Sequence, residues 1–118
     1  MTTPTQRTMK ALRDKGYKTG IVERWIMGAR VRKDLFGFID GIAIRDKEIL
    51  GWQACAGSGL AAHVTKIRDA CRLEAQAWLE AGGKIEVWGW RKLKVKRGGK
   101  AVRWTPCVVP ITTLDTGA

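Results

Sequence analysis

The spacing of hydrophobic side chains near the start of the chain is that of a helix. Met9 and Leu12 lie three residues apart, as they do on one face of an α-helix. Pro4 suits a first helical turn because its missing amide is not needed there, and Gly16 is a typical helix end. The pattern therefore predicts a helix over Thr5–Lys15.

Three β-rich segments follow this helix. We predict strands over Lys18–Ile26, Phe38–Ile44 and Glu48–Ala56. A basic connector, Met27–Phe36, separates the first two strands. The last two are separated by a short polar turn at Arg45–Glu48, so a hairpin is their simplest arrangement.

A second stripe of hydrophobic side chains has helical spacing. Its members are Leu60, Val64, Ile67, Cys71, Ala75, Trp78 and Leu79. The glycine-rich segment Ala56–Gly59 precedes the stripe, and Gly82-Gly83 ends it. The spacing predicts helix from Leu60 to about Ala81 and allows an interruption near Cys71.

The last part of the chain is predicted to be a second hairpin. Its strands are Lys84–Arg97 and Lys100–Ile111, and Gly98-Gly99 between them supplies the positive φ angles of a tight primed turn. Pro106 and Pro110 have no amide to donate to a neighbouring strand. The last strand is therefore predicted to lie at a sheet edge.

Side chains alternate in character along the first strand of this hairpin. One face carries Lys84, Glu86, Trp88, Trp90, Lys92, Lys94 and Lys96, whereas the opposite face is mainly aliphatic. If the aliphatic face meets the core, Trp88 and Trp90 form a stacking platform beside a basic strip. The alternative is that both tryptophans pack beneath a helix as ordinary core.

The predicted order of elements is α-β-β-β-α-β-β, without a repeat or a linker. It indicates one α/β domain over residues 1–118, with a frayed tail at 114–118. The hydrophobic fraction of 45% is sufficient for a core. No apolar run approaches the roughly 18 residues of a membrane span, and Met1–Arg13 lacks the apolar stretch of a secretory signal. We therefore expect a cytoplasmic, or at least intracellular, location.

The charge balance indicates that the domain has a binding partner. Lys and Arg total 22 and Asp and Glu total 11, so the net charge is +11. A small domain with so strong a positive field usually meets a polyanion, and nucleic acid is the first candidate. An acidic protein partner, a membrane surface and charge kept for solubility remain as alternatives.

The cysteine and histidine content argues against several kinds of site. The three cysteines, Cys55, Cys71 and Cys107, are odd in number and form no CxxC pair, which disfavours a disulfide scaffold or a zinc ribbon. We expect them to be reduced and mostly buried. The single histidine, His63, excludes a His-rich metal site, and we expect a structural or exposed role for it.

Hairpin geometry predicts a cluster of polar side chains. If Asp46 and Lys47 form a two-residue loop, Asp40 faces Gln53, with their Cβ atoms about 5 Å apart. Cys55 shares the face of Gln53 because strand side chains alternate. A longer turn would shift this register.

Two carboxylates lie within apolar surroundings. Asp40 follows Phe38-Ile39, and Glu23 follows Ile21-Val22. A carboxylate among apolar residues costs free energy unless it is paired, hydrogen-bonded or bound to a cation. Carboxylates on adjacent strands suit a hard divalent cation such as Mg²⁺ or Mn²⁺. The alternative is that each carboxylate pairs with a neighbouring basic residue.

The stretches Lys33–Asp40 and Ile49–Cys55, within this order of elements, resemble the PD-(D/E)XK nuclease superfamily. Within it, the chain is similar to small phage and archaeal Holliday junction resolvases and to VRR-NUC nucleases. The resemblance covers roughly residues 5–90 and implies an α/β core with a mixed sheet, here followed by a C-terminal β-hairpin. Asp40 matches the metal-binding Asp, Gln53 stands in place of the D/E, and Cys55 stands in place of the Lys.

The resemblance implies a Mg²⁺-dependent endonuclease acting on branched or structured DNA, with Glu23, Asp34, Asp40 and Gln53 around the metal. Gln53 is a weaker ligand than a carboxylate, and a thiol at Cys55 cannot replace the charge of the Lys. Lys33 or Lys66 would have to supply that charge. The alternative is a nuclease-fold protein that binds nucleic acid, or inhibits another nucleic-acid protein, without cutting. The resemblance to resolvases also implies a homodimer.

Basic residues outside this cluster are candidate phosphate contacts. They are Arg30, Arg32 and Lys33 in the connector, Lys66 and Arg68 in the helical segment predicted from Leu60, and Lys92, Lys94 and Lys96 in the last hairpin.

Overall fold

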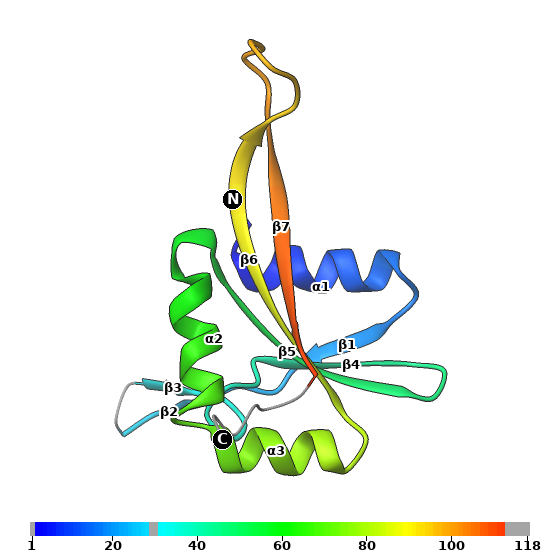
Figure 1. Cartoon of the computed structure of the whole chain (residues 1–118), viewed down its shortest axis with the longest axis vertical. Helices are drawn as coiled ribbons and strands as arrows, with labels where there is room; N and C mark the ends of the chain where they lie inside the picture. Colours follow the sequence, from blue (N-terminus) through cyan, green and yellow to red (C-terminus); the bar gives the residue numbers. More distant parts are fainter. Residues whose placement is uncertain (1, 29–30, 113–118) are drawn as a thin grey trace.

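The structure is a computed structural model that describes residues 2–28 and 31–112 (Figure 1). Its helices are α1 (Pro4–Asp14), α2 (Leu60–Arg68) and α3 (Arg72–Glu80), with a 3₁₀ turn at Gly57–Gly59. Its strands are β1 (Lys18–Ile21), β2 (Arg24–Ile26), β3 (Val31–Lys33), β4 (Gly41–Arg45), β5 (Glu48–Ala56), β6 (Lys84–Lys94) and β7 (Val102–Ile111). The fold is α/β, and none of the described helices is long and apolar enough to cross a membrane.

Five strands form a mixed sheet in the order β1-β4-β5-β6-β7. β1, β4 and β5 are antiparallel neighbours, and β6 and β7 form an antiparallel hairpin. β5 and β6 are parallel, and the helices α2 and α3 connect them, as a parallel pair requires a long crossover. The expected α/β class and mixed sheet are confirmed, and β7 lies at the predicted edge.

Helices cover both faces of this sheet. On one face Leu12 of α1 packs with Trp52, Trp88 and Trp90. On the other face Ile67 of α2 and Ala75 of α3 belong to a second buried cluster. Of the two alternatives for Trp88 and Trp90, packing beneath a helix is confirmed and the stacking platform is wrong: they are 1% and 7% exposed and belong to the core, because α1 covers their face of β6.

The first two predicted strands are shorter than expected. β1 ends at Ile21, and the amides of Val22 and Glu23 both donate to the carbonyl of Asp40, so the ladder stops there. β2 then pairs with β3 in a separate two-stranded sheet inside the predicted connector. The strand predicted over Phe38–Ile44 begins only at Gly41.

Several other predicted elements are confirmed. α1 starts one residue before the predicted range, and Thr3 caps it in a capping box with Gln6. β5 has the predicted bounds, and the second helical stripe is interrupted at Cys71, the residue before α3. Cys55 and Cys71 are buried free thiols as expected, but Cys107 is exposed. The tail predicted at 114–118 lies outside the described residues.

The β6–β7 hairpin extends from the body of the molecule as an arm (Figure 1). The strands end at Lys94 and Val102, and the amide of Val95 still donates to the carbonyl of Ala101, so the loop spans residues 96–100 and is longer than the two-residue turn predicted. The amide of Gly99 donates to the carbonyl of Lys96, and Gly98 alone of the two glycines has a positive φ, 78°. This is a four-residue turn with glycine at its third position, which tolerates positive φ.

Candidate metal centre

The β4–β5 hairpin brings Asp40 to β5 in the predicted register. Arg45 pairs with Glu48 across the Asp46-Lys47 loop. Asp40 lies one residue before β4, and its amide donates to the carbonyl of Trp52 over 2.9 Å. Its carboxylate Oδ2 accepts a 2.9 Å hydrogen bond from the amide of Ala54. The carboxylate is thus fixed against β5 beside Gln53, although Asp40 itself is outside the strand.

A tight turn brings Asp34 to Asp40. Leu35 and Ile39 form an isolated antiparallel bridge, and Asp34 and Asp40 flank it on its outer side. The two residues at the tip, Phe36 and Gly37, have positive φ angles of 57° and 83°. Such a turn reverses the chain within a few residues.

Glu23 reaches the same place from the break after β1. Its amide donates to the carbonyl of Asp40 over 3.3 Å. Carboxylate oxygens of Glu23, Asp34 and Asp40 all lie within 4.8 Å of one another. These three carboxylates could hold a metal ion, and they lie within one stretch of the chain, residues 23–40, that folds back on itself.

Gln53 on β5 completes the cluster. Its Nε2 donates to Oδ2 of Asp34 over 3.2 Å, and the residue is only 3% exposed. Its Oε1 is buried and has no hydrogen-bond partner among the described residues. A buried acceptor without a partner is costly and requires an explanation. A cation between the carboxylates and this oxygen would supply one.

The protonation of Asp40 reflects this crowding. The pKa of Asp40 is raised from 3.8 to about 8, chiefly by burial and also by the hydrogen bond and charge of Asp34 and the charge of Glu23. The hydrogen bond from Ala54 acts in the opposite direction. Without a cation, Asp40 therefore holds a proton at neutral pH.

The donor set indicates which metals fit. The four residues offer only oxygen, from three carboxylates and one amide. Hard divalent cations such as Mg²⁺ and Mn²⁺ prefer such ligands, whereas zinc sites in proteins usually include Cys or His. Cys55 does not add a soft ligand, because burial, followed by the charge of Asp40, raises the pKa of its thiol.

The chain matches no protein-family model, and no curated protein or solved structure matches it significantly. Only the geometry of the acidic cluster therefore indicates what chemistry it could perform. All four predicted site residues, Glu23, Asp34, Asp40 and Gln53, are brought together.

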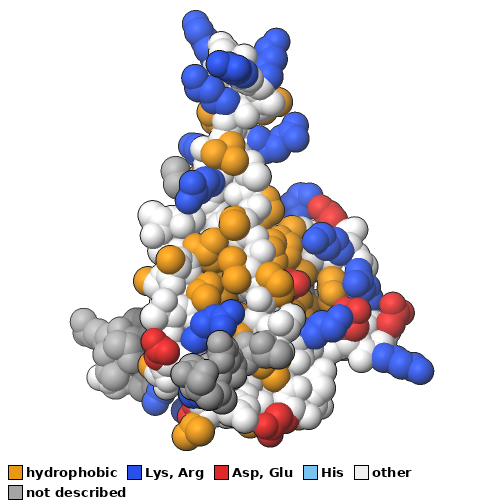
Figure 2. Space-filling view, in the orientation of Figure 1, with side chains coloured by type: hydrophobic (Ala, Val, Ile, Leu, Met, Phe, Trp, Pro, Cys, Tyr) orange, Lys and Arg blue, Asp and Glu red, His pale blue; other side chains and the backbone are white. Residues whose placement is uncertain are grey.

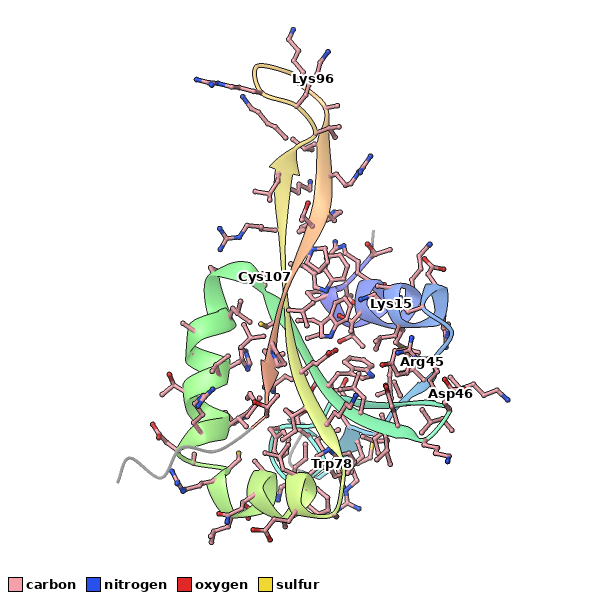
Figure 3. All side chains as sticks on the ribbon, turned by 45° about the vertical axis from the view of Figure 1, so that its right-hand side comes forward. Lys15, Arg45, Asp46, Trp78, Lys96 and Cys107 are labelled. Carbon is pink, nitrogen blue, oxygen red and sulfur yellow. The ribbon has the colours of Figure 1, made fainter. Side chains whose placement is uncertain are left out.

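The predicted phosphate-contacting residues are not all placed. Arg30 and the side chain of Arg32 lie outside the described part of the chain. Lys33 ends β3 directly before Asp34 and is exposed. On α2, Lys66 is exposed and Arg68 is half-buried. The arm residues Lys92, Lys94 and Lys96 are all exposed, and Lys96 lies near the tip (Figure 3).

His63 has a closer relationship to the acidic cluster than its sequence position indicated. Burial lowers the pKa of His63, and Lys66 lowers it further, whereas the charge of Asp34 raises it. Its Nδ1 is buried and has no hydrogen-bond partner among the described residues. No sequence signal links His63 with Asp34, because their proximity depends on how α2 packs.

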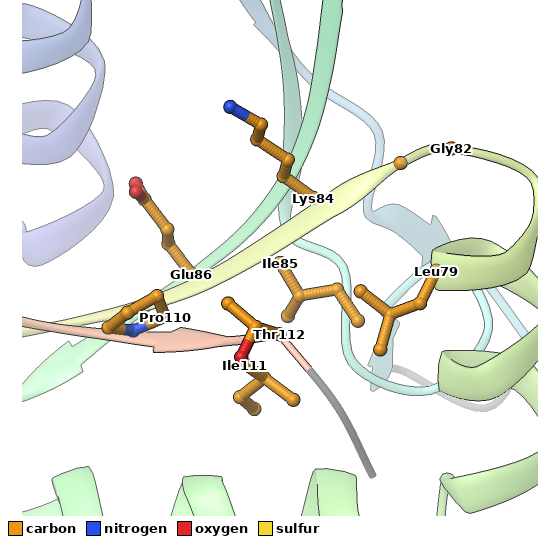
Figure 4. A pocket seen from close by; sticks show the side chains of 9 residues that line it. Leu79, Gly82, Lys84, Ile85, Glu86, Pro110, Ile111 and Thr112 are labelled. Atoms are coloured by element: carbon orange, nitrogen blue, oxygen red, sulfur yellow. The ribbon is translucent and has the colours of Figure 1, made fainter.

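A separate cleft of about 360 Å³ lies between the end of α3 and the strands β6 and β7 (Figure 4). Its two charged side chains already have partners. Lys84 pairs with Glu48 over 3.2 Å, and Glu86 accepts a hydrogen bond from the indole of Trp88. This cleft offers no group for chemistry, so the acidic cluster remains the candidate site.

Proposed function

We propose that this protein is a divalent-cation-dependent endonuclease of PD-(D/E)XK type that cuts branched or otherwise structured DNA. One observation carries the proposal: three carboxylates within 4.8 Å of one another lie beside a buried amide oxygen of Gln53 that has no partner among the described residues. The order of elements also supports it, since an antiparallel β1-β4-β5 meander is followed by a helical crossover to the parallel strand β6.

Each residue of the site has a defined role in this proposal. Glu23, Asp34, Asp40 and the Oε1 of Gln53 would hold Mg²⁺ or Mn²⁺. The bound cation would polarise the scissile phosphate and lower the pKa of the attacking water. The amide of Ala54 orients the Asp40 carboxylate, and Nε2 of Gln53 orients that of Asp34.

Positive charge around this site would position the DNA. The net charge of +11 provides long-range attraction to phosphates. Lys33 is adjacent to Asp34 in the chain, and Lys66 is close enough to affect the pKa of His63. Lys33 and Lys66 are therefore the candidates for the positive charge that a lysine supplies in the nuclease family and that the Cys55 thiol lacks. His63, kept neutral by burial, is the candidate proton acceptor.

A binding protein without cleavage is the second candidate function. The observation that favours it is Cys55, whose buried thiol keeps its proton. By the resemblance, this thiol takes the place of a lysine of the nuclease family. Such a protein would keep the acidic cluster as a structural cation site. It would bind nucleic acid through the basic surface alone.

A cleavage assay separates the two functions. Labelled four-way junction, duplex and single-stranded DNA are incubated with the protein in Mg²⁺, Mn²⁺ or EDTA. The nuclease proposal predicts cation-dependent cutting of the junction that Asp40→Asn abolishes and Asp46→Asn retains. Asp46 is a matched control because it lies exposed at the β4–β5 turn (Figure 3). Binding without cutting under every condition would favour the second candidate.

A further inference from the structure

An exposed tryptophan on the arm, Trp104, is contacted by two cations. It lies on the edge strand β7 and is 39% exposed. The guanidinium carbon of Arg7, from α1, lies 3.5 Å from the centre of its ring, and the Nζ of Lys92, its partner on β6, lies 5.2 Å from that centre. Both are within the range of a cation–π interaction.

Trp104 forms one side of a groove between α1 and the foot of the arm. The groove has a volume of about 530 Å³, within the usual range of small-ligand sites. Its lining residues are Thr2, Gln6, Arg7, Lys10, Ala11 and Asp14 from the N-terminal segment, and Trp90, Arg103, Trp104 and Pro106 from the arm. Figure 2 shows apolar surface beside the foot of the arm with Lys and Arg side chains along its edge.

The charge of this groove favours an anionic occupant. Among the described residues that line it, Arg7, Lys10 and Arg103 are basic, and Asp14 is the one acidic residue. Asp14 is already paired with Lys10 over 3.0 Å. The Nε of Arg7 is buried and has no hydrogen-bond partner among the described residues. An aromatic ring with surplus positive charge around it fits a flat base attached to a phosphate.

The groove is continuous with the basic arm. From Trp104 to the tip, the exposed basic residues of the arm are Lys92, Lys94, Lys96, Arg97, Lys100 and Arg103. Lys and Arg side chains cover the upper part of the molecule in Figure 2. A strand of nucleic acid whose base lies on Trp104 would therefore have cationic partners for its following phosphates.

We propose that the α1–β7 groove is a binding site for an unpaired nucleotide, with the base stacked on the face of the Trp104 ring that Arg7 leaves open and a phosphate beside Arg7 and Arg103. An unpaired base is required because the faces of bases within a duplex are covered by their neighbours. This site is separate from the acidic cluster, and its binding does not depend on cleavage. For the nuclease, it would select DNA with a single-stranded segment next to the cut.

Binding of a short labelled oligothymidine and of a duplex of equal length is measured by fluorescence anisotropy in EDTA. Trp104→Ala is expected to weaken oligothymidine binding about tenfold and duplex binding less than twofold. Trp104→Phe keeps an aromatic face and is expected to retain most of the affinity. Lys47→Ala and Leu73→Ala, at exposed positions remote from the groove, are the controls for charge and for surface apolarity. Thermal melting verifies that each variant is folded.

Three results would overturn the proposal: wild-type protein that does not bind oligothymidine, Trp104→Ala that binds it normally, or equal loss of single-stranded and duplex binding. Equal loss would mean that the groove contacts phosphates but does not stack a base. The outcome is independent of the nuclease proposal, because Asp40→Asn is expected to bind oligothymidine like the wild type. A protein that stacks a base but cuts nothing would refute only the nuclease.

Discussion

Asp34 and Asp40 face each other across a turn of five residues, one position outside the Leu35–Ile39 bridge, with carboxylate oxygens within 4.8 Å. Two like charges at this distance repel unless a proton or a cation lies between them. The fold holds them there through backbone contacts, since Asp40 is hydrogen-bonded to Trp52 and to Ala54. The arrangement of Asp34 and Asp40 therefore favours a proton or a cation between their carboxylates.

The turn between these two residues depends on Gly37. Its φ of 83° is unfavourable for any residue with a Cβ, and a Cβ there would lie 3.2 Å from the Sγ of Cys71. We predict that Gly37→Ala destabilises the protein by about 1–2 kcal/mol, lowers its Tm by about 4 °C or more, and weakens Mn²⁺ binding. Gly20→Ala is the control, because nothing lies within 4 Å of its added Cβ. Equal Tm values for the two variants in a melting experiment would contradict this account of the turn.

Stability should depend on pH through Asp40. Its pKa is about 8 in the folded protein and near 3.8 in the unfolded chain, so between these values the folded state binds the extra proton. Stability is therefore greatest below about pH 4 for this group and falls as the pH rises towards 8. Glu48, whose pKa is lowered, acts below pH 4.5, whereas His63, whose pKa burial lowers from 6.5, favours folding as the pH rises towards 6.5 and so opposes the fall in the lower part of this window.

We predict that the Tm in EDTA falls between pH 5 and pH 8.5, that Mn²⁺ reverses the fall, and that Asp40→Asn removes it. The reason for the reversal is that a bound cation replaces the proton between the carboxylates. Calorimetric melting at several pH values checks both effects. A fall of the same size in Asp40→Asn would show that another group is responsible.

The amide oxygen of Gln53 is predicted to be a weak ligand that can be strengthened. Gln53→Glu adds a fourth carboxylate and is expected to raise Mn²⁺ affinity about tenfold or more, while lowering the Tm in EDTA through repulsion. Gln53→Leu has no oxygen ligand and is expected to lower the affinity by a similar factor. Isothermal titration calorimetry distinguishes these results, and unchanged affinity in both variants would place Gln53 outside the site.

The arm should contribute to DNA binding mainly through charge. We predict that replacing Lys92, Lys94 and Lys96 with Ala reduces the slope of log affinity against log salt by about 2–3 for duplex DNA. Lys47→Ala, on the exposed β4–β5 turn, should change it little. Anisotropy titrations in EDTA over a range of salt provide the slopes. A triple variant with the wild-type slope would mean that the arm does not touch phosphates.

The sequence was sufficient to predict the parts of the site that depend on one hairpin. The position of Asp40 beside Gln53 followed from a two-residue turn and the alternation of strand side chains. The structure has this register. Glu23 was expected because it is a carboxylate among apolar residues, and Asp34 was expected from family resemblance, but their positions depend on features with no sequence pattern. These are the break after Ile21 and the positive φ of Phe36, which is uncommon for a residue with a large side chain.

The faces of β6 could not be assigned from the sequence for a different reason. Alternation identifies the buried face of a strand only when the other face meets water. Here α1 covers Trp88 and Trp90, while Ile85 and Val87 belong to the cluster that includes α2 and α3. Both faces of β6 therefore pack in the core, and alternation cannot distinguish a buried face from an exposed one. Trp104 was overlooked because its cationic neighbour Arg7 is on α1, almost a whole chain length away.

Titration of the protein with Mn²⁺ by isothermal calorimetry tests the central claim most directly. The acidic cluster is predicted to bind one cation per chain, with proton release near neutral pH, and Asp40→Asn is predicted to lose this binding. The matched variant Asp46→Asn should retain it. Absence of binding in the wild type, or equal binding by Asp40→Asn, would contradict the assignment of Glu23, Asp34, Asp40 and Gln53 as a metal centre.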